Sequence, residues 1–127
     1  MNLLVDTHAL LWFVAGDTRL SPTARQAIAS PDTVNYISVA SWWEMAVKCS
    51  LGKLRLDDPF DVFVKQRTWE GFRTLSIETN HLPALVSLPF HHRDPFDRLM
   101  ICQAIQEKMP VCSADENFSR YGVDVIW

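Results

Sequence analysis

Four acidic residues in this sequence could together bind a metal ion. Asp6, Asp97 and Asp115 stand where a strand or loop passes into a helix, and Glu44 stands one turn into the helix after the second predicted strand. Carboxylates that lie close together raise one another's pKa, so they stay ionised only around a cation. Their hard oxygen atoms suit Mg²⁺ or Mn²⁺. The chemistry that follows is metal-assisted hydrolysis of a phosphodiester bond, in which cations activate water and stabilise charge on the phosphate.

Each of these acids also has a structural interpretation, because acidic side chains at a helix start can bond backbone amides. Asp6 precedes an apolar helix, where Asp is a common N-cap. Ser41 and Glu44 stand in the Ser-x-x-Glu relation of a capping box. Glu44 is also one turn from Lys48, with which it could form an exposed ion pair. Both interpretations stay open at this point.

The tetrapeptide Asp-Pro-Phe-Asp occurs twice, at 58–61 and at 94–97, and both copies suit a helix start. The second copy follows two histidines and an arginine and opens a strongly apolar helix, whereas the first opens a helix with a solvated face. We therefore predict that Asp97 is functional and that Asp58 and Asp61 are structural.

The elements that must position the acids alternate between strands and helices. Apolar and β-branched runs predict strands just before Asp6 and at 34–39, 72–77, 109–113 and 123–127. Capping residues, Pro and Gly delimit helices at 9–15, 23–29, from about 41 to before 52, 58–69, 78–86 and from 94 onward.

This alternation predicts an α/β fold, a three-layered α/β/α sandwich around a central, mostly parallel five-stranded sheet. A doubly wound order of 3-2-1-4-5 would place the first and fourth strands side by side at the switch point, where ligands bind in such sheets. All four acids would then open on one crevice. The length of 127 residues suits a single domain, 1–127.

Composition narrows the class of protein. The net charge of −3 does not suit a general nucleic-acid coat protein, so any contact with nucleic acid needs a local basic patch, for which Lys48, Arg93 and Arg98 are candidates. No apolar run is long enough to span a bilayer, and no signal peptide is expected. An odd number of cysteines within apolar segments favours buried, reduced thiols in a cytoplasmic protein.

Four stretches of the sequence resemble, in order and at suitable spacing, the motifs of PIN-domain toxins of the VapC type. They are Asp6-Thr7-His8; Ser41 to Lys48 with Gly52-Lys53-Leu54; His91 to Met100; and Ser113 to Phe118. The resemblance covers essentially the whole chain. One such motif would be a weak indication, but four in sequence are specific.

The resemblance implies a PIN-like nuclease domain: a Mg²⁺- or Mn²⁺-dependent endoribonuclease that cleaves RNA. It also implies a homodimer, and a gene beside that of a cognate antitoxin which occludes the site. Asp6, Glu44, Asp97 and Asp115 match the acidic quartet of the family, and Asp94 matches an extra carboxylate that one branch carries.

Other polar residues carry two interpretations each. Thr7 and Ser113 could hydrogen-bond a metal-binding carboxylate or cap helices. His91 and His92 could contact phosphate or lie solvated in a loop. His8 and His81 have no evident partner in the sequence.

Two rival functions use clustered aspartates differently. A receiver-like module binds Mg²⁺ and accepts a phosphoryl group on one aspartate; this would explain Asp6 and a nearby lysine but not the other three acids together. A phosphatase with Asp6 as nucleophile would usually carry a second Asp two residues later, where this chain has His8.

Overall fold

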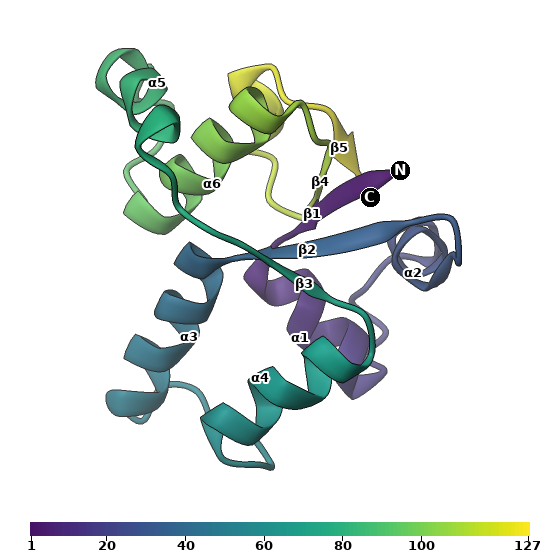
Figure 1. Cartoon of the computed structure of the whole chain (residues 1–127). Coiled ribbons are helices and arrows are strands. Elements are labelled where there is room, and N and C mark those ends of the chain that lie inside the picture. The colour runs from purple at the N-terminus through teal and green to yellow at the C-terminus, as the bar shows by residue number, and fades with distance from the viewer.

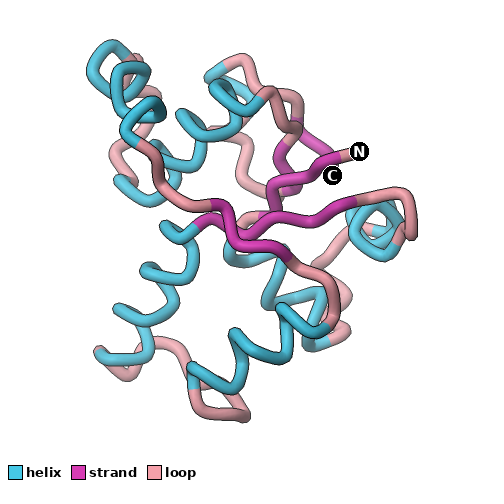
Figure 2. Tube along the Cα trace, viewed as in Figure 1, coloured by secondary structure: helices cyan, strands magenta, loops and turns pink.

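A five-stranded parallel sheet in the order β3-β2-β1-β4-β5 forms the centre of the protein. The structure is a computed structural model and describes residues 1–127. The strands are β1 (Asn2–Val5), β2 (Val34–Ser38), β3 (Arg73–Leu75), β4 (Val111–Cys112) and β5 (Val125–Ile126). The predicted parallel order 3-2-1-4-5 is therefore confirmed, and Figure 2 shows the strands meeting at the centre of the chain trace.

Helices cover both faces of this sheet (Figure 1). They are α1 (Thr7–Ala15), α2 (Pro22–Ala29), α3 (Val39–Ser50), α4 (Phe60–Trp69), α5 (Leu82–Ser87) and α6 (Pro95–Glu107), with short 3₁₀ turns η1 (Thr79–His81) and η2 (Ser119–Tyr121). In β1, Leu3 and Val5 pack into one core with α1 to α4, while Leu4 packs into a second core with α6. Alternate residues of a strand point to opposite faces, so an uninterrupted apolar run is what a strand covered on both sides requires. The α/β/α arrangement is confirmed.

Most helix boundaries follow the local sequence. Gly16 ends α1 in the left-handed conformation, with φ of 64°, which Gly adopts without strain. The Ser21 hydroxyl accepts a bond from the Ala24 amide at the start of α2. None of the helices combines the length and the apolar character needed to cross a membrane.

The start of α3 differs from the prediction. The helix begins at Val39 rather than near Ser41, because the Ser38 hydroxyl accepts a hydrogen bond from the Ala40 amide at 3.0 Å and takes the capping position. Ser41 is buried, and its hydroxyl lies 3.2 Å from the sulfur of Met100. The capping box of Ser41 and Glu44 is therefore not formed, and Glu44 has another role in the structure.

Other differences are smaller. Strands β3, β4 and β5 are shorter than predicted, and the expected helix at 78–86 divides into η1 and α5. All three cysteines are free, but only Cys102 and Cys112 are buried, while Cys49 is half-buried near the end of α3.

Candidate metal centre

The carboxyl ends of the parallel strands bring together acids that are far apart in the sequence. Asp6 directly follows β1, and its amide donates to the Cys112 carbonyl of β4 at 3.1 Å. Asp115 lies three residues beyond the end of β4, so both acids lie at the edge where β1 and β4 are neighbours. Glu44 comes from the second turn of α3 and Asp97 from the first turn of α6.

Asp6 and Asp115 each bond the backbone of the turn that carries them. Asp6 Oδ1 accepts from the Ala9 amide at 2.8 Å and so caps α1. Asp115 Oδ1 accepts from the Asn117 amide at 2.9 Å. These bonds fix the direction of each carboxylate. The capping interpretation of Asp6 is thus correct, and it is compatible with a place in the cluster.

Ser113 supports both of these acids. Its hydroxyl oxygen accepts from the Asp115 amide at 3.0 Å, and its side chain lowers the pKa of the nearby Asp6 carboxyl. Ser113 is buried. Ser113 therefore bonds the backbone of the turn that carries Asp115 and lies beside the Asp6 carboxylate.

Glu44 is held from two sides. The Thr7 hydroxyl donates to its Oε1 at 2.6 Å, which links the start of α1 to α3. Lys48 Nζ lies 3.1 Å from its Oε2. The predicted pair with Lys48 exists, but it is not an exposed pair, since the Glu44 side chain is only 9% exposed and that of Lys48 36%.

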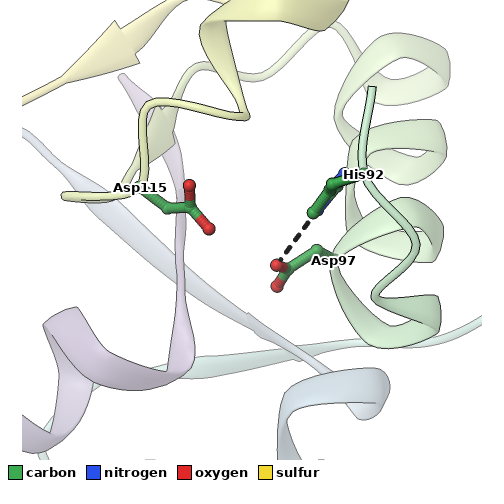
Figure 3. Close-up of side chains that lie close together, drawn as sticks. All are labelled: His92, Asp97 and Asp115. Atoms are coloured by element: carbon green, nitrogen blue, oxygen red, sulfur yellow. Dashed lines mark hydrogen bonds and ion pairs between the residues drawn. The ribbon is translucent and has the colours of Figure 1, made fainter. Parts of the chain in front are cut away.

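Asp97, Asp115 and His92 form the tightest group of possible metal ligands (Figure 3). One ligand atom from each lies within 4.8 Å of the other two. His92 Nε2 is 3.2 Å from Asp97 Oδ2. The His92 side chain is 14% exposed, so it is a partly buried neighbour of Asp97 and not a solvated loop residue.

The two Asp-Pro-Phe-Asp copies behave differently. In the second copy, Asp94 Oδ1 caps α6 by accepting from the amides of Phe96 and Asp97 at 2.9 and 3.0 Å. The Asp97 side chain makes no backbone bond and faces the cluster. In the first copy, α4 begins at Phe60 without a side-chain cap, and both acids are exposed.

Two carboxyl groups of the cluster, those of Asp97 and Asp6, have pKa values above the ordinary range. Burial, and after it the charges of Asp94, Glu44, Asp115 and Asp6, together raise the pKa of Asp97 to about 8. Burial also raises the pKa of Asp6, although the bonds from Ser113 and the Ala9 amide act the other way. Four oxygen-donor side chains that cannot all ionise alone fit a divalent cation, which favours their charged forms.

Arg98 does not occupy the surface position expected of an RNA-binding residue. It is 4% exposed. Its guanidinium donates to the carbonyls of Pro89 at 2.8 Å and Leu88 at 3.1 Å, and it stacks on the ring of Phe90 at 3.8 Å. Three partners of this kind account for its burial, so Arg98 stabilises the loop before α6. Arg93, in contrast, is exposed.

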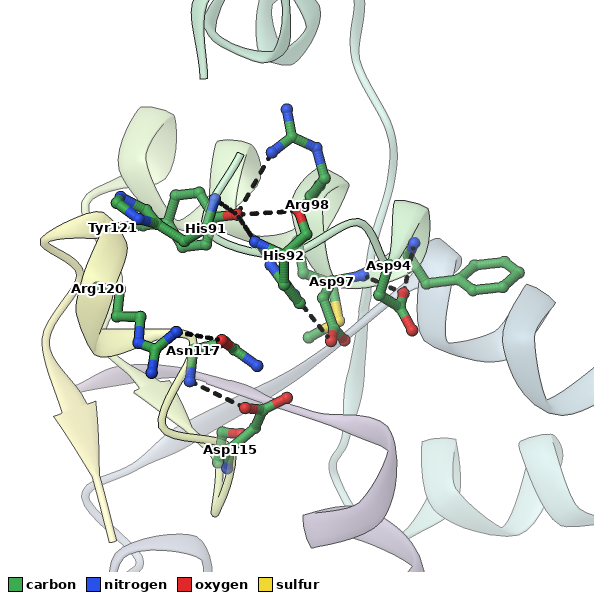
Figure 4. A network of polar contacts seen from close by, with 12 residues as sticks. His91, His92, Asp94, Asp97, Arg98, Asp115, Asn117, Arg120 and Tyr121 are labelled. Atoms are coloured by element: carbon green, nitrogen blue, oxygen red, sulfur yellow. Dashed lines mark hydrogen bonds and ion pairs between the residues drawn. The ribbon is translucent and has the colours of Figure 1, made fainter. Parts of the chain in front are cut away.

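Tyr121 lies beside the site, and the sequence analysis did not identify it. Its hydroxyl lies 2.8 Å from His92 Nδ1 and 3.3 Å from Arg98 Nη1 (Figure 4). It comes from η2, 24 residues after Asp97, and no residue spacing connects the two. A tyrosine just beyond the last acidic motif is the only indication that the sequence offers.

Hollows beside the acids leave room for a large ligand. A cavity of about 530 Å³ lies between α1 and the segment that runs from the end of α3 into α4, next to Thr7 and Lys48. A smaller hollow of about 250 Å³ lies against Asp6 and Asp115. The two hollows share two lining residues, His8 and Trp12.

Comparisons with known proteins agree with this architecture. The family model of the PIN domain matches residues 3–124. The ribonuclease VapC22 of Mycobacterium tuberculosis is 31% identical over 115 residues, which cover 90% of this chain and 87% of that protein.

Solved structures share the fold at low sequence identity. VapBC2 of Rickettsia felis, bound to a DNA fragment from its promoter, superposes with a TM-score of 0.72 at 10% identity over 98% of this chain and 97% of the other. VapC20 of Mycobacterium tuberculosis, a toxin that cleaves the sarcin–ricin loop, gives 0.67 at 18% identity over 95% of both chains. The resemblance seen in the four motifs is confirmed: the chain belongs to the PIN-domain family, on its VapC-type side.

Proposed function

We propose that residues 1–127 form one PIN nuclease domain, a toxin-like endoribonuclease that acts in the cytoplasm and depends on Mg²⁺ or Mn²⁺. The observation that carries the proposal is the convergence of four carboxylates from separate segments on one partly buried position, where burial and then the charges of neighbouring acids raise the pKa of Asp97 to about 8. A stable fold has no need of such repulsion, whereas a divalent-cation site requires this density of negative charge. Two similar proteins support this activity: VapC22 is a ribonuclease, and VapC20 is a toxin that cleaves the sarcin–ricin loop.

Asp6, Asp97 and Asp115 are the residues that would hold the cation, with Glu44 adding charge beside them. The cation supplies Lewis-acid activation of water and charge stabilisation on the phosphate. Mg²⁺ and Mn²⁺ both suit oxygen ligands of this kind.

The protein's own groups would orient the acids and bind the substrate. Thr7 and Lys48 hold the two oxygens of Glu44, so that its charge stays directed at the cluster. Lys48 lines the large cavity together with the exposed side chains of Lys53 and Arg55. Although Asp17, Asp57 and Asp58 line the same cavity, these three cations would supply the local positive charge that an acidic protein needs in order to bind an RNA backbone.

The duplicated tetrapeptide supplies a matched experiment. Cleavage of a labelled RNA is measured in Mg²⁺, in Mn²⁺ and in EDTA for wild type, Asp97→Asn and Asp61→Asn. We expect metal-dependent cleavage by wild type and by Asp61→Asn, and none by Asp97→Asn, since only Asp97 belongs to the cluster. Equal loss in both variants, or cleavage that persists in EDTA, would contradict the proposal.

We also propose a protein partner, a cognate antitoxin, and a homodimeric state. Support for the antitoxin comes from structural neighbours that were solved as complexes, among them a toxin–antitoxin complex from Klebsiella pneumoniae and FitAB, which is described in complex with DNA. Co-expression with the product of the adjacent gene, followed by size-exclusion chromatography with light scattering, tests both. A monomer that the neighbouring protein neither binds nor inhibits would argue against them.

The rival functions are disfavoured. A receiver module of the CheY type has strand order 2-1-3-4-5, whereas this sheet has the order 3-2-1-4-5. A phosphatase nucleophile at Asp6 would need its acid partner at position 8, where His8 is exposed on the first turn of α1. Transfer of phosphate to the protein, in place of RNA cleavage, is the outcome that would restore them.

A further inference from the structure

We propose that His92 is a positioning residue for Asp97, and that Tyr121 fixes the tautomer of the His92 ring so that its Nε2–H donates to Asp97. The inference rests on the proposed metal-dependent function for its consequence, but the hydrogen bonds themselves are properties of the folded chain. It assigns a role to two residues outside the acidic quartet.

The hydrogen bonds of Tyr121 determine the direction of the network in Figure 4. Its phenolic oxygen accepts hydrogen bonds from the backbone amides of His91 and His92, each at 3.2 Å, and from Nη1 of Arg98 at 3.3 Å. These three long hydrogen bonds share the two lone pairs of that oxygen. Its one hydrogen remains to be donated.

The Tyr121 hydrogen has two acceptors within reach, both on His92. The ring atom Nδ1 lies at 2.8 Å and the backbone carbonyl at 3.4 Å. The shorter contact is the hydrogen bond, since a further donor aimed at the phenolic oxygen would meet two lone pairs that three donors already share. Nδ1 is therefore an acceptor without a proton, and the neutral ring carries its proton on Nε2.

The Nε2–H then points at Asp97 Oδ2, 3.2 Å away. This is the only hydrogen bond that the Asp97 carboxylate receives from the protein. The other acids are held differently: Asp6 by the Ala9 amide, Asp115 by the Asn117 amide, and Glu44 by a hydroxyl and an ammonium group. The orientation of Asp97 therefore depends on His92 in a way that no other acid of the cluster does.

The network also connects the two segments that carry Asp97 and Asp115. Tyr121 follows Asp115 in the segment after β4, whereas His92 and Arg98 flank Asp97 at the start of α6. Arg98 is buried and holds the loop carbonyls of Leu88 and Pro89, so it provides the fixed point of the arrangement. With one oxygen held by an N–H donor, the other is left to a cation. Groups that orient metal ligands in this way typically contribute roughly 10- to 100-fold to metal affinity.

The test compares three substitutions with a matched control. His92→Phe keeps the ring and removes the donor, His92→Gln restores an N–H near the Nε2 position, and Tyr121→Phe removes only the hydroxyl. The control is His91→Phe, because the His91 side chain is exposed and packs edge-on against Tyr121 without a ring hydrogen bond. Mn²⁺ affinity is measured by titration calorimetry, and melting curves establish that each variant is folded.

We expect His92→Phe to weaken Mn²⁺ binding by roughly 10- to 100-fold, His92→Gln to recover most of that loss, and His91→Phe to bind as wild type. In the metal-free wild type, long-range ¹H–¹⁵N spectra of the ring should show His92 as the Nε2–H tautomer, and in Tyr121→Phe a mixture of both tautomers. The wild-type spectrum is recorded on the metal-free protein, so it depends neither on the folding of a variant nor on metal binding.

Two results would overturn the role of His92: a wild-type ring protonated on Nδ1, or equal Mn²⁺ affinity in His92→Phe and His91→Phe. Failure of the proposed function has a different result, namely that wild type itself binds no Mn²⁺ and cleaves no RNA. That outcome would remove the consequence for metal binding as well, whereas the first two leave the metal-dependent function intact.

Discussion

Neutralising Asp97 should make the metal-free protein more stable at neutral and alkaline pH, although the same change should abolish cleavage. Its folded-state pKa of about 8 lies far above the ordinary 3.8, chiefly because of burial and then because of four neighbouring carboxylates. A carboxyl group whose pKa is raised by folding favours the folded state below its unfolded pKa, and this contribution is lost as the pH rises towards about 8.

The magnitude follows from that difference. Each pKa unit corresponds to about 1.4 kcal/mol, so ionising Asp97 in the metal-free fold costs at most about 6 kcal/mol. Its side chain is 20% exposed, and counter-ions and side-chain movement reduce the cost in solution. We expect about 2–3 kcal/mol, which for a domain of this size is roughly 6–12 °C in Tm.

The assay is thermal unfolding of wild type and Asp97→Asn between pH 5 and 9, in EDTA and in millimolar Mn²⁺. In EDTA, the Tm of the variant minus that of wild type should increase from pH 5 to 8 and then level off. In Mn²⁺ the difference should change sign, because the cation binds and stabilises only the wild-type site. A Tm difference in EDTA that does not vary with pH would refute this account of the cluster.

Three further predictions follow from other contacts of the site. Glu44→Gln keeps an oxygen for the Thr7 hydroxyl but loses the charge, so Tm should change by only a few degrees while RNA cleavage falls by roughly 100-fold or more; a fully active variant would remove Glu44 from the site. Asp6→Asn should reduce the increase in Tm that Mn²⁺ produces in wild type, as followed by scanning fluorimetry, and an undiminished increase would place the cation elsewhere. Arg98→Met should lower the free energy of unfolding in urea by about 2–4 kcal/mol, because buried carbonyls of the preceding loop lose their donor; the salt dependence of RNA binding should be unchanged, and a smaller salt slope would instead give Arg98 a phosphate contact.

The order of the sheet could be predicted from the sequence, and with it the edge at which Asp6 and Asp115 lie. Strand β1 is apolar at consecutive positions, which indicates a strand covered on both faces, and Leu3 and Leu4 do pack into opposite cores. A central parallel strand that ends in an acid places that acid at the ligand-binding edge of the sheet. The predicted strand order puts β4 beside β1, so it also places Asp115 at this edge before any contact is known.

The sequence could not decide which of two similar residues caps a helix. Two serines, Ser38 and Ser41, stand three residues apart, and either one is a good N-cap. The earlier one caps α3 because β2 ends there and its hydroxyl faces the first free amide. The later one is turned into the core, which no helix-start pattern reveals.

Contacts between loops were also beyond prediction. Arg98 is an ordinary surface residue by type, and only the return of the 88–93 loop past α6 supplies the carbonyls that bury it. The pairing of His92 with Tyr121 joins irregular segments 29 residues apart. Periodicity, which carries the information about helices and strands, says nothing about such segments.

The strand order also has a consequence for synthesis of the protein. During translation β1 with Asp6 is made before the other strands, but it lies between β2 and β4, and β4 with Asp115 follows more than a hundred residues later. Until then the central strand has an unpaired edge, the kind of surface on which incomplete chains associate. A nascent chain therefore carries Asp6, Glu44 and Asp97 without a finished site, and a product truncated before β4 should cleave no RNA. Because the proposed site joins residues that lie early and late in the chain, we expect activity to begin only after β4 and Asp115 have been made.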